Sequence, residues 1–361
     1  MDYSGTSVDT FNTIMPFIDE GTVIPIISNS FRLEEIFRED DELVMHLADV
    51  PEFYDEVRTI DQQLTKLWAN KIGYPMSDNH NLARVAQYRQ VESGDPELAK
   101  IEYLKFVSER LLKISEKREG YESKVIQLRT QTQRLVFSDI AQQLDYPHFP
   151  ESLEDPLRLL ARLPLPIYIT TSYSSFLERA LELEDKVPRT QICFWSGGKS
   201  GVKQEHLPDP NFDPTPTNPA VYHLFGLENY KKTLILSEDD YINFLMNAVE
   251  EINSQDLYPT PLRLNLPDAR LILLGYNLRD WDFRALFRFI LRVRKTATAR
   301  ESQSTIIQFK PSLEKKDFEI KSLRYLERYF EDNKFRVRWS NAEKFVYDLW
   351  DAWDRYRQGQ L

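Results

Sequence analysis

The stretch GTVIPIISNSF at residues 21–31 has the composition of a turn, a buried strand and the beginning of a helix. Its apolar run is short and continuous, which is typical of a parallel strand covered on both faces. In nucleotide-binding α/β domains, this junction usually carries glycines that let the backbone approach a phosphate. Here it carries Ser28, Asn29 and Ser30. The stretch therefore predicts the first strand of an α/β sheet, followed by a loop of altered chemistry.

Strands and helices alternate again in the second half of the chain. Short runs rich in β-branched and aromatic residues are separated by helical segments, a pattern that favours a parallel sheet with helices on both sides. The predicted strands are 22–27, 166–171, 190–195, 220–225, 269–275, 304–309 and 335–339. The predicted helices of this half are 174–184, 237–252, 280–295, 317–332 and 341–357. We expect an α/β fold with a doubly wound, mostly parallel, Rossmann-like sheet.

A helical block separates the first predicted strand from the others. The run IEYLKFVSERLLKI at 101–114 spaces apolar residues at helical intervals, which predicts one apolar stripe. The stripe contains Ile101, Leu104, Val107, Leu111 and Leu112. We therefore expect residues 1–50 to begin the Rossmann-like domain, 51–145 to form a helical insertion and 146–361 to complete the domain. The proline-rich stretch 196–220 is expected to be a long loop.

Composition and charge exclude several classes of protein. A chain of 361 residues that is 42% hydrophobic can bury a large core. The formal charge of −11 disfavours a general nucleic-acid-binding surface, so we expect no direct nucleic-acid contact. The first residues, MDYSGTSVDTF, lack the basic segment of a signal peptide, and no apolar run approaches ~18 residues. We expect no membrane span and a cytoplasmic location.

Motifs for metal or phosphate binding are weak. The one cysteine, Cys193, cannot form an intramolecular disulfide or a multi-cysteine zinc site. None of the five histidines belongs to an HExxH pair, so we expect no metal. SGGKS at 196–200 resembles part of a phosphate-binding P-loop, but the pattern requires a glycine where Cys193 stands. We interpret it as part of the loop.

Polar residues gather where two predicted strands end. Thr171 and Ser172 follow one strand, and Ser174 or Ser175 is placed to cap the next helix. A second strand ends at Gly275 and is followed by Asn277 and Asp280. Ligands of open α/β sheets bind at this edge. Gly275 allows close approach of a ligand to the backbone, whereas Asp280 also suits the start of any helix.

His223 has two interpretations. It lies near the end of the predicted strand 220–225, on the same face as Val221 and Phe225. It is either a core histidine with its hydrogen bonds satisfied or a polar group presented to a ligand at the carboxyl end of a strand.

Several stretches together resemble one known family. They are VIPIISNS, IYITTSYSSFLERAL, VYHLFG followed by LILSEDDYINFL, LILLGYNLRDWDFRALF and FRVRWSNAEKFVYDLW, in this order over roughly residues 20–353. They resemble the sirtuin-like family, specifically its bacterial branch associated with antiphage defence. The resemblance implies a Rossmann-like NAD site in which an Asn of a TTN-type motif and a His of an HG motif serve NAD cleavage.

The chain departs from the family pattern at its polar positions. The Gly-Ala-Gly loop of the family falls on Ser28, Asn29 and Ser30, and the catalytic Asn falls on Ser172. The HG dipeptide falls on Phe225-Gly226, two residues after His223, while GYNLRDWDF is intact. By resemblance, Ser172 and His223 are the candidate catalytic residues. The candidate NAD-binding residues are Ser28, Asn29, Ser30, Thr171, Gly275, Asn277 and Asp280.

Two functions remain open from the sequence. The first is an NAD⁺ glycohydrolase that releases nicotinamide and ADP-ribose, so that NAD⁺ depletion stops phage growth in an abortive infection. In that function Ser172 and Asn277 hold the ribose, and His223 positions or activates water. The second is a catalytically silent sirtuin-like subunit that acts as a nucleotide sensor or scaffold for a partner protein. Protein deacetylation is not expected, because deacetylating sirtuins carry a four-cysteine zinc module.

Assembly is also expected from the sequence. The helical block carries many aromatic residues, such as Tyr54, Trp68, Tyr74, Tyr103 and Phe106. If one sheet domain cannot cover them, exposed patches would mark an interface. We expect a homo-oligomer or a complex with a protein encoded nearby, for example a defence ATPase or a sensor.

Overall fold

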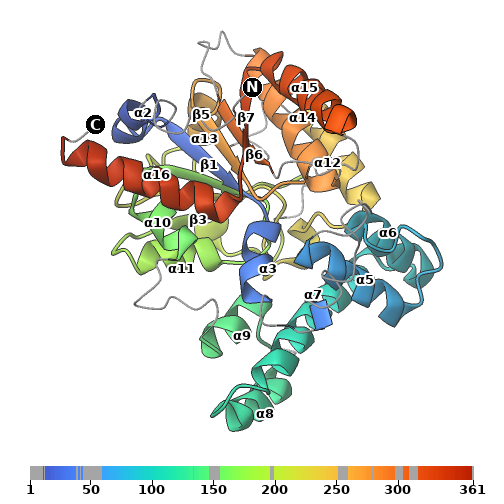
Figure 1. Cartoon of the computed structure of the whole chain (residues 1–361). Helices are drawn as coiled ribbons and strands as arrows, with labels where there is room; N and C mark the ends of the chain where they lie inside the picture. The colour runs from blue at the N-terminus through green and yellow to red at the C-terminus, as the bar shows by residue number, and fades with distance from the viewer. Residues whose placement is uncertain are drawn as a thin grey trace.

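A computed structural model shows a single parallel sheet with helices on both faces (Figure 1). The structure describes residues 11, 13–37, 40, 42–43, 59–132, 134–145, 155–195, 199–250, 259–277, 280–296, 304–308 and 316–359. Predicted features at Tyr54, in the first residues of SGGKS and in the residues on either side of position 50 lie outside this part of the chain.

Seven strands form the sheet in the order β3-β4-β2-β1-β5-β6-β7, and every pairing is parallel. The strands are β1 (Val23–Ile27), β2 (Ile167–Thr170), β3 (Arg189–Ile192), β4 (Ala220–His223), β5 (Arg270–Leu274), β6 (Ser304–Gln308) and β7 (Phe335–Trp339). All seven predicted strands are present, with ends that differ from the prediction by at most three residues. The predicted doubly wound α/β fold is confirmed.

Alternation along each strand divides the core into two layers. In β1, Val23 and Ile27 face one apolar cluster, while Ile24 and Ile26 face the other. The first layer contains α2 (Met15–Asp19), α10 (Pro156–Arg162), α11 (Phe176–Glu182) and α16 (Ala342–Arg357). The second contains α12 (Glu238–Glu250), α13 (Thr260–Asn265), α14 (Trp281–Thr296) and α15 (Lys316–Glu331). In β1, β2 and β4, side chains from both faces are removed from water, which explains their largely apolar runs in the sequence.

A group of helices lies between α3 (Ser30–Ile36) and α10 in the chain and projects beyond α3 in space (Figure 1). These helices are α5 (Ile60–Ile72), α6 (Leu82–Ser93), α7 (Pro96–Ser115), α8 (Glu122–Gln131) and α9 (Phe137–Gln143). The side chains of Thr59, Asn81 and Asp95 accept backbone hydrogen bonds at the starts of α5, α6 and α7. Each cap satisfies a donor that the helix itself leaves unpaired.

The apolar residues of this insertion pack mostly within the chain. Trp68 and Tyr103 are fully buried, with ring centroids 5.1 Å apart, and Phe106 is buried beside them in the first layer. They are core residues here, so they do not support the predicted interface. Of the predicted stripe on α7, Leu104, Val107, Leu111 and Leu112 are buried, whereas Ile101 is exposed. Within the described residues, no helix combines the length and apolar character needed to cross a bilayer.

Candidate functional site

The central strand β1 lies where the winding of the sheet changes direction. Its neighbours are β2 on one side and β5 on the other, and all three end at the same edge. Open α/β sheets bind ligands in the crevice that this arrangement creates. The chain leaves β1 through Ser28 and Asn29, β2 through Thr171 and β5 through Gly275. The predicted site residues are brought to this edge by topology alone.

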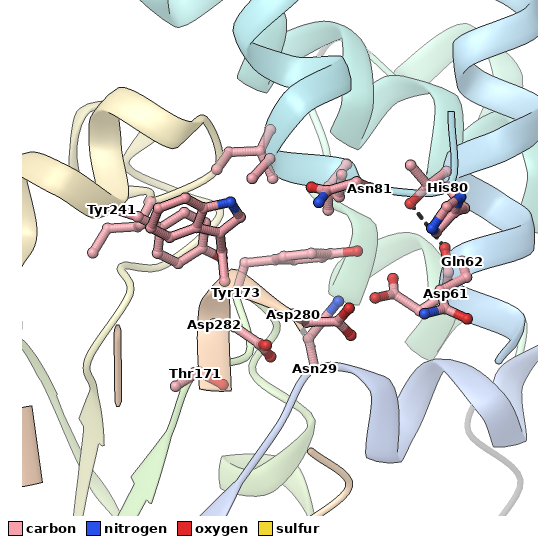
Figure 2. Close-up of a pocket in the computed structure, with 16 residues that line it drawn as sticks. Asn29, Asp61, Gln62, His80, Asn81, Thr171, Tyr173, Tyr241, Asp280 and Asp282 are labelled. Atoms are coloured by element: carbon pink, nitrogen blue, oxygen red, sulfur yellow. Dashed lines mark hydrogen bonds between the residues drawn. The ribbon is translucent and has the colours of Figure 1, made fainter. Parts of the chain in front are cut away.

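A pocket opens at this edge, and we call it the acidic pocket (Figure 2). Its empty volume, including the mouth, is about 630 Å³. The sheet edge contributes Asn29, Thr171, Tyr173, Asp280, Trp281 and Asp282. The insertion contributes Asp61, Gln62, Thr65, His80, Asn81, Leu82 and Ala83. The segment that leads into α12 contributes Ile235, Leu236 and Tyr241. Sheet and insertion thus form opposite walls of one cavity, of a size suited to a small ligand or one end of a dinucleotide.

The first loop ties two strands together. The Ser28 hydroxyl donates to the Gly275 carbonyl at 2.6 Å and accepts from the Phe31 amide at 3.2 Å. Gly275 has φ +76°, and a Cβ there would lie 2.6 Å from Ser28 Oγ and 2.7 Å from Phe31 Cβ. The loop after β1, rather than a ligand, therefore approaches the backbone of Gly275 closely. Neither Ser28 nor Gly275 lines the acidic pocket.

Ser172 lies behind the pocket wall and contacts Asn29. Its hydroxyl donates to Asn29 Oδ1 at 3.0 Å, lies 2.8 Å from Ser174 Oγ and accepts from the Ser174 amide at 3.2 Å. Asn29 itself lines the cavity, and Figure 2 shows its side chain directed upward from the loop toward Asp280. Because Ser172 binds the amide oxygen, the amide nitrogen of Asn29 is the atom left for a ligand.

His223 is completely buried and does not line the acidic pocket. Its Nδ1 lies 3.0 Å from the Ser172 carbonyl oxygen, and its Nε2 lies 2.8 Å from Glu178 Oε1. Burial alone would lower the pKa of His223, but the Glu178 carboxylate outweighs it and the pKa is raised. Both ring nitrogens are occupied within the protein. The expected role of His223 in activating water therefore lacks a path to the cavity, and its geometry is that of a residue that anchors the loop after β2.

The remaining predicted residues are divided between the pocket and its surroundings. Thr171 and Asp280 line the pocket, and the Thr171 hydroxyl lies 2.9 Å from Tyr276 Oη. The Ser30 hydroxyl donates to Asp61 Oδ2 at 3.3 Å, and the Asn277 carbonyl accepts from the Asp280 amide. Ser175 precedes α11 without the predicted side-chain cap. Its amide instead donates to Ser138 Oγ at 3.0 Å.

Three carboxyl groups set the charge of the cavity. Burial raises the pKa of Asp61 to about 6, opposed by the hydrogen bond from Ser30. Burial and the nearby Asp280 raise the pKa of Asp282 well above its usual range. Asp61 Oδ1 is buried without a hydrogen-bond partner, and so is the hydroxyl of Tyr173. These are polar atoms in the pocket wall that a ligand can satisfy.

Aromatic rings form the other side of the cavity. Tyr241 and Trp281 stack with centroids 6.1 Å apart at 21°, and Figure 2 shows Tyr173 extending across the pocket beside them. Among the residues that the structure describes, no Lys or Arg lines the cavity. Carboxylates and aromatic faces both attract a cation. The acidic pocket thus suits a positively charged ring joined to hydroxyl-bearing groups and disfavours a phosphate.

The described residues contain no cluster of three or more histidine, cysteine or acidic side chains suited to hold a metal ion. Cys193 is fully buried, and burial raises the pKa of its thiol to about 12. A thiol in this state has little thiolate character, which metal ligation and nucleophilic chemistry require.

A comparison with models of protein families finds a match over almost half of the chain. The model of the SIR2-like domain family covers residues 166–336, from the start of β2 into β7. Residues 166–336 are thus similar in sequence to SIR2-like domains. The sirtuin-like resemblance predicted from the motifs is thereby confirmed for this range, while β1 and the insertion lie outside it.

One curated relative is similar over part of the chain. It is the NAD(+) hydrolase ThsA of Bacillus cereus (strain MSX-D12), which is 23% identical over 192 residues. The match covers 53% of this chain and 33% of that protein, so the chain spans about a third of the relative's length.

Proposed function

We propose that the acidic pocket binds the nicotinamide–ribose end of NAD⁺ and hydrolyses the bond between them. The charge of the cavity carries this proposal. Among the described residues, carboxyl groups and aromatic rings line the cavity and no Lys or Arg does, at the edge where open α/β sheets bind ligands. The nicotinamide ring of NAD⁺ is a cation, and positive charge moves onto the ribose as the bond breaks. Fixed negative charge close to that ribose stabilises the transition state.

In the proposed reaction, Asp61 is the base. Water attacks C1′ of the ribose as the C1′–N bond breaks, and the bonding electron pair neutralises the nicotinamide nitrogen. The proton of the water passes to Asp61, whose unpartnered Oδ1 lies in the pocket wall. A pKa of about 6 leaves Asp61 ionised at neutral pH yet basic enough to accept a proton. The products are nicotinamide and ADP-ribose.

The residues around Asp61 bind and orient the ribose and the nicotinamide ring. The amide of Asn29, held by Ser172, donates to a ribose hydroxyl. Asp282, whose pKa is raised by burial and by the nearby Asp280, lies in the same wall and is placed to contact the nicotinamide carboxamide. Trp281, Tyr241 and Tyr173 cover the ring and exclude water from it. Ser172 and His223 act here by positioning.

The biological setting extends this proposal. Hydrolysis of NAD⁺ in a cytoplasmic antiphage response would deplete the pool on which phage growth depends. Assembly into a homo-oligomer, or with a protein encoded nearby, has weak support from apolar side chains of the insertion that remain exposed, namely Met76, Val91 and Ile126. Similarity to an NAD(+) hydrolase favours catalysis over the silent-subunit alternative.

Release of nicotinamide from NAD⁺ by the purified chain, measured by liquid chromatography with and without the co-expressed neighbouring protein, tests the proposal. We expect equal amounts of nicotinamide and ADP-ribose. Saturable NAD⁺ binding without any product, in both preparations, would favour the silent subunit instead.

A further inference from the structure

A second pocket lies on the same sheet, away from the proposed NAD⁺ site. It is lined by Phe11, Thr13, Ile14, Arg270, Thr305, Arg336, Arg338 and Phe345, and we call it the arginine pocket. Its empty volume, including the mouth, is about 410 Å³. In the part of the chain that the structure describes, no aspartate or glutamate lines it. Arg270 begins β5, whereas Asp280 of the acidic pocket follows the opposite end of that strand, so the two pockets are distinct sites.

The strand register explains why the guanidinium groups converge. Thr305 pairs with Arg336 and also with Ile272, so these three positions lie side by side on one face of the sheet. Arg270 is two residues before Ile272 and Arg338 is two residues after Arg336, which places both on that face. Ile272 belongs to the apolar layer that α16 covers. Arg270 pairs with Val23 and Arg338 with Ile307, so two of the three arginines have apolar residues beside them on the next strand, whereas Arg336 pairs with Thr305.

These arginines lack the partners that buried cations usually have. Within the described residues, the side chains of Arg270, Arg336 and Arg338 form no ion pair and donate no hydrogen bond, and Arg270 Nε is buried without an acceptor. The guanidinium of Arg270 lies 3.6 Å from the centroid of the Phe17 ring, and that of Arg338 lies 4.8 Å from the centroid of Phe11. Stacking on rings holds the groups in place but leaves their N–H donors unused.

The neighbouring guanidinium groups of the arginine pocket repel each other. Burial, together with the adjacent Arg336, lowers the pKa of Arg338, and Asp348 opposes the shift only in part. Asp348 is itself bound by Lys344, at 3.1 and 3.2 Å from its two oxygens. Like charges in one partly buried pocket repel each other, and an anion that enters removes the repulsion and accepts the free N–H groups.

We propose that the arginine pocket binds a phosphate-bearing small molecule. Guanidinium groups match phosphate oxygens in pairs, and three of them suit a diphosphate better than a single carboxylate. Phe11 and Phe345, with ring centroids 5.5 Å apart, add an apolar wall that a base or another ring attached to the phosphate can contact. The site does not depend on the function proposed for the acidic pocket.

Calorimetric titration of the full chain with inorganic pyrophosphate and with ADP, at low ionic strength, tests the proposal. We expect saturable binding that weakens at least about tenfold in both Arg338→Gln and Arg336→Gln, because each change removes charged donors. Tighter binding of ADP would identify a nucleotide, and equal binding would identify the phosphate group alone as the ligand.

The matched control is Arg324→Gln, an exposed arginine of α15 for which no ion pair is found within the described residues. It should bind both probes like the wild type. Arg336 is itself exposed, so Arg336→Gln should fold normally and keeps the test valid if Arg338→Gln is unstable. Absence of saturable binding to the wild type, or equal weakening in Arg324→Gln, would overturn the proposal.

Discussion

The acidic pocket and the arginine pocket are built on the same sheet, yet their linings have opposite charge. Counting the described residues alone, three carboxyl groups and no Lys or Arg line the first, whereas three guanidinium groups and no carboxylate line the second. The net charge of the whole chain, −11, does not indicate the local charge of either pocket. The difference shows that strand ends and strand faces concentrate charge locally. The ligand of each pocket must therefore be inferred from the residues that line that pocket.

The strongest test of the acidic pocket is Asp61→Asn. The change keeps the shape of the side chain but removes both the negative charge near the ribose and the base, so we expect kcat to fall by about 10³-fold. Steady-state release of nicotinamide measures it. Glu119→Gln, an exposed carboxyl of the insertion outside the pocket, is the control and should retain wild-type activity. Equal activity of Asp61→Asn and the control would remove Asp61 from the mechanism.

A smaller effect is expected for the residue pair that contacts the ribose. Asn29→Ala removes a donor in the pocket wall, and we expect about a 10²-fold loss in kcat. Ser172→Ala leaves Asn29 in place without its hydrogen bond, so its loss should be about tenfold. The order of the two losses is the informative result. A larger loss in Ser172→Ala would return the catalytic role to the position that the family resemblance assigns.

Ser28→Gly tests whether the first loop still serves a ligand. The family loop carries glycine at this position, so a glycine here would tighten NAD⁺ binding if the loop faced the diphosphate. In the structure this change removes two hydrogen bonds that join β1, α3 and the end of β5. We expect the free energy of unfolding, measured by urea titration, to fall by about 1–2 kcal/mol without tighter NAD⁺ binding. Tighter binding in calorimetry would show that the loop faces the diphosphate.

The sheet was predictable because each strand carries its own signal. Continuous apolar runs such as the one at β5 identify strands that are buried on both faces, and all seven were found in this way. The edge of the site was predictable for the same reason, since Asn29, Thr171 and Asp280 directly follow strands and do line the acidic pocket.

The other half of the acidic pocket could not be predicted. Asp61 lies on α5, and His80 and Asn81 lie in the turn that leads into α6. The position of these helices over the sheet depends on tertiary packing, and their polar residues carry no local signal of a site. For His223, the sequence predicted the position but not the side-chain contacts. Its place in the strand was predicted, but only the structure shows Glu178, which lies 45 residues earlier in the chain, at Nε2.

The pH dependence of nicotinamide release from NAD⁺, measured as kcat between about pH 4.5 and 8, tests the central claim most directly. Burial raises the pKa of Asp61 to about 6, and the base must be ionised to accept a proton. We predict a rate that is constant above that value and falls about tenfold for each pH unit below it, with ADP-ribose released in equal amount. A rate that stays constant down to pH 4.5 in the folded protein, or no release of nicotinamide at any pH, would contradict the assignment of the acidic pocket as the site of NAD⁺ hydrolysis.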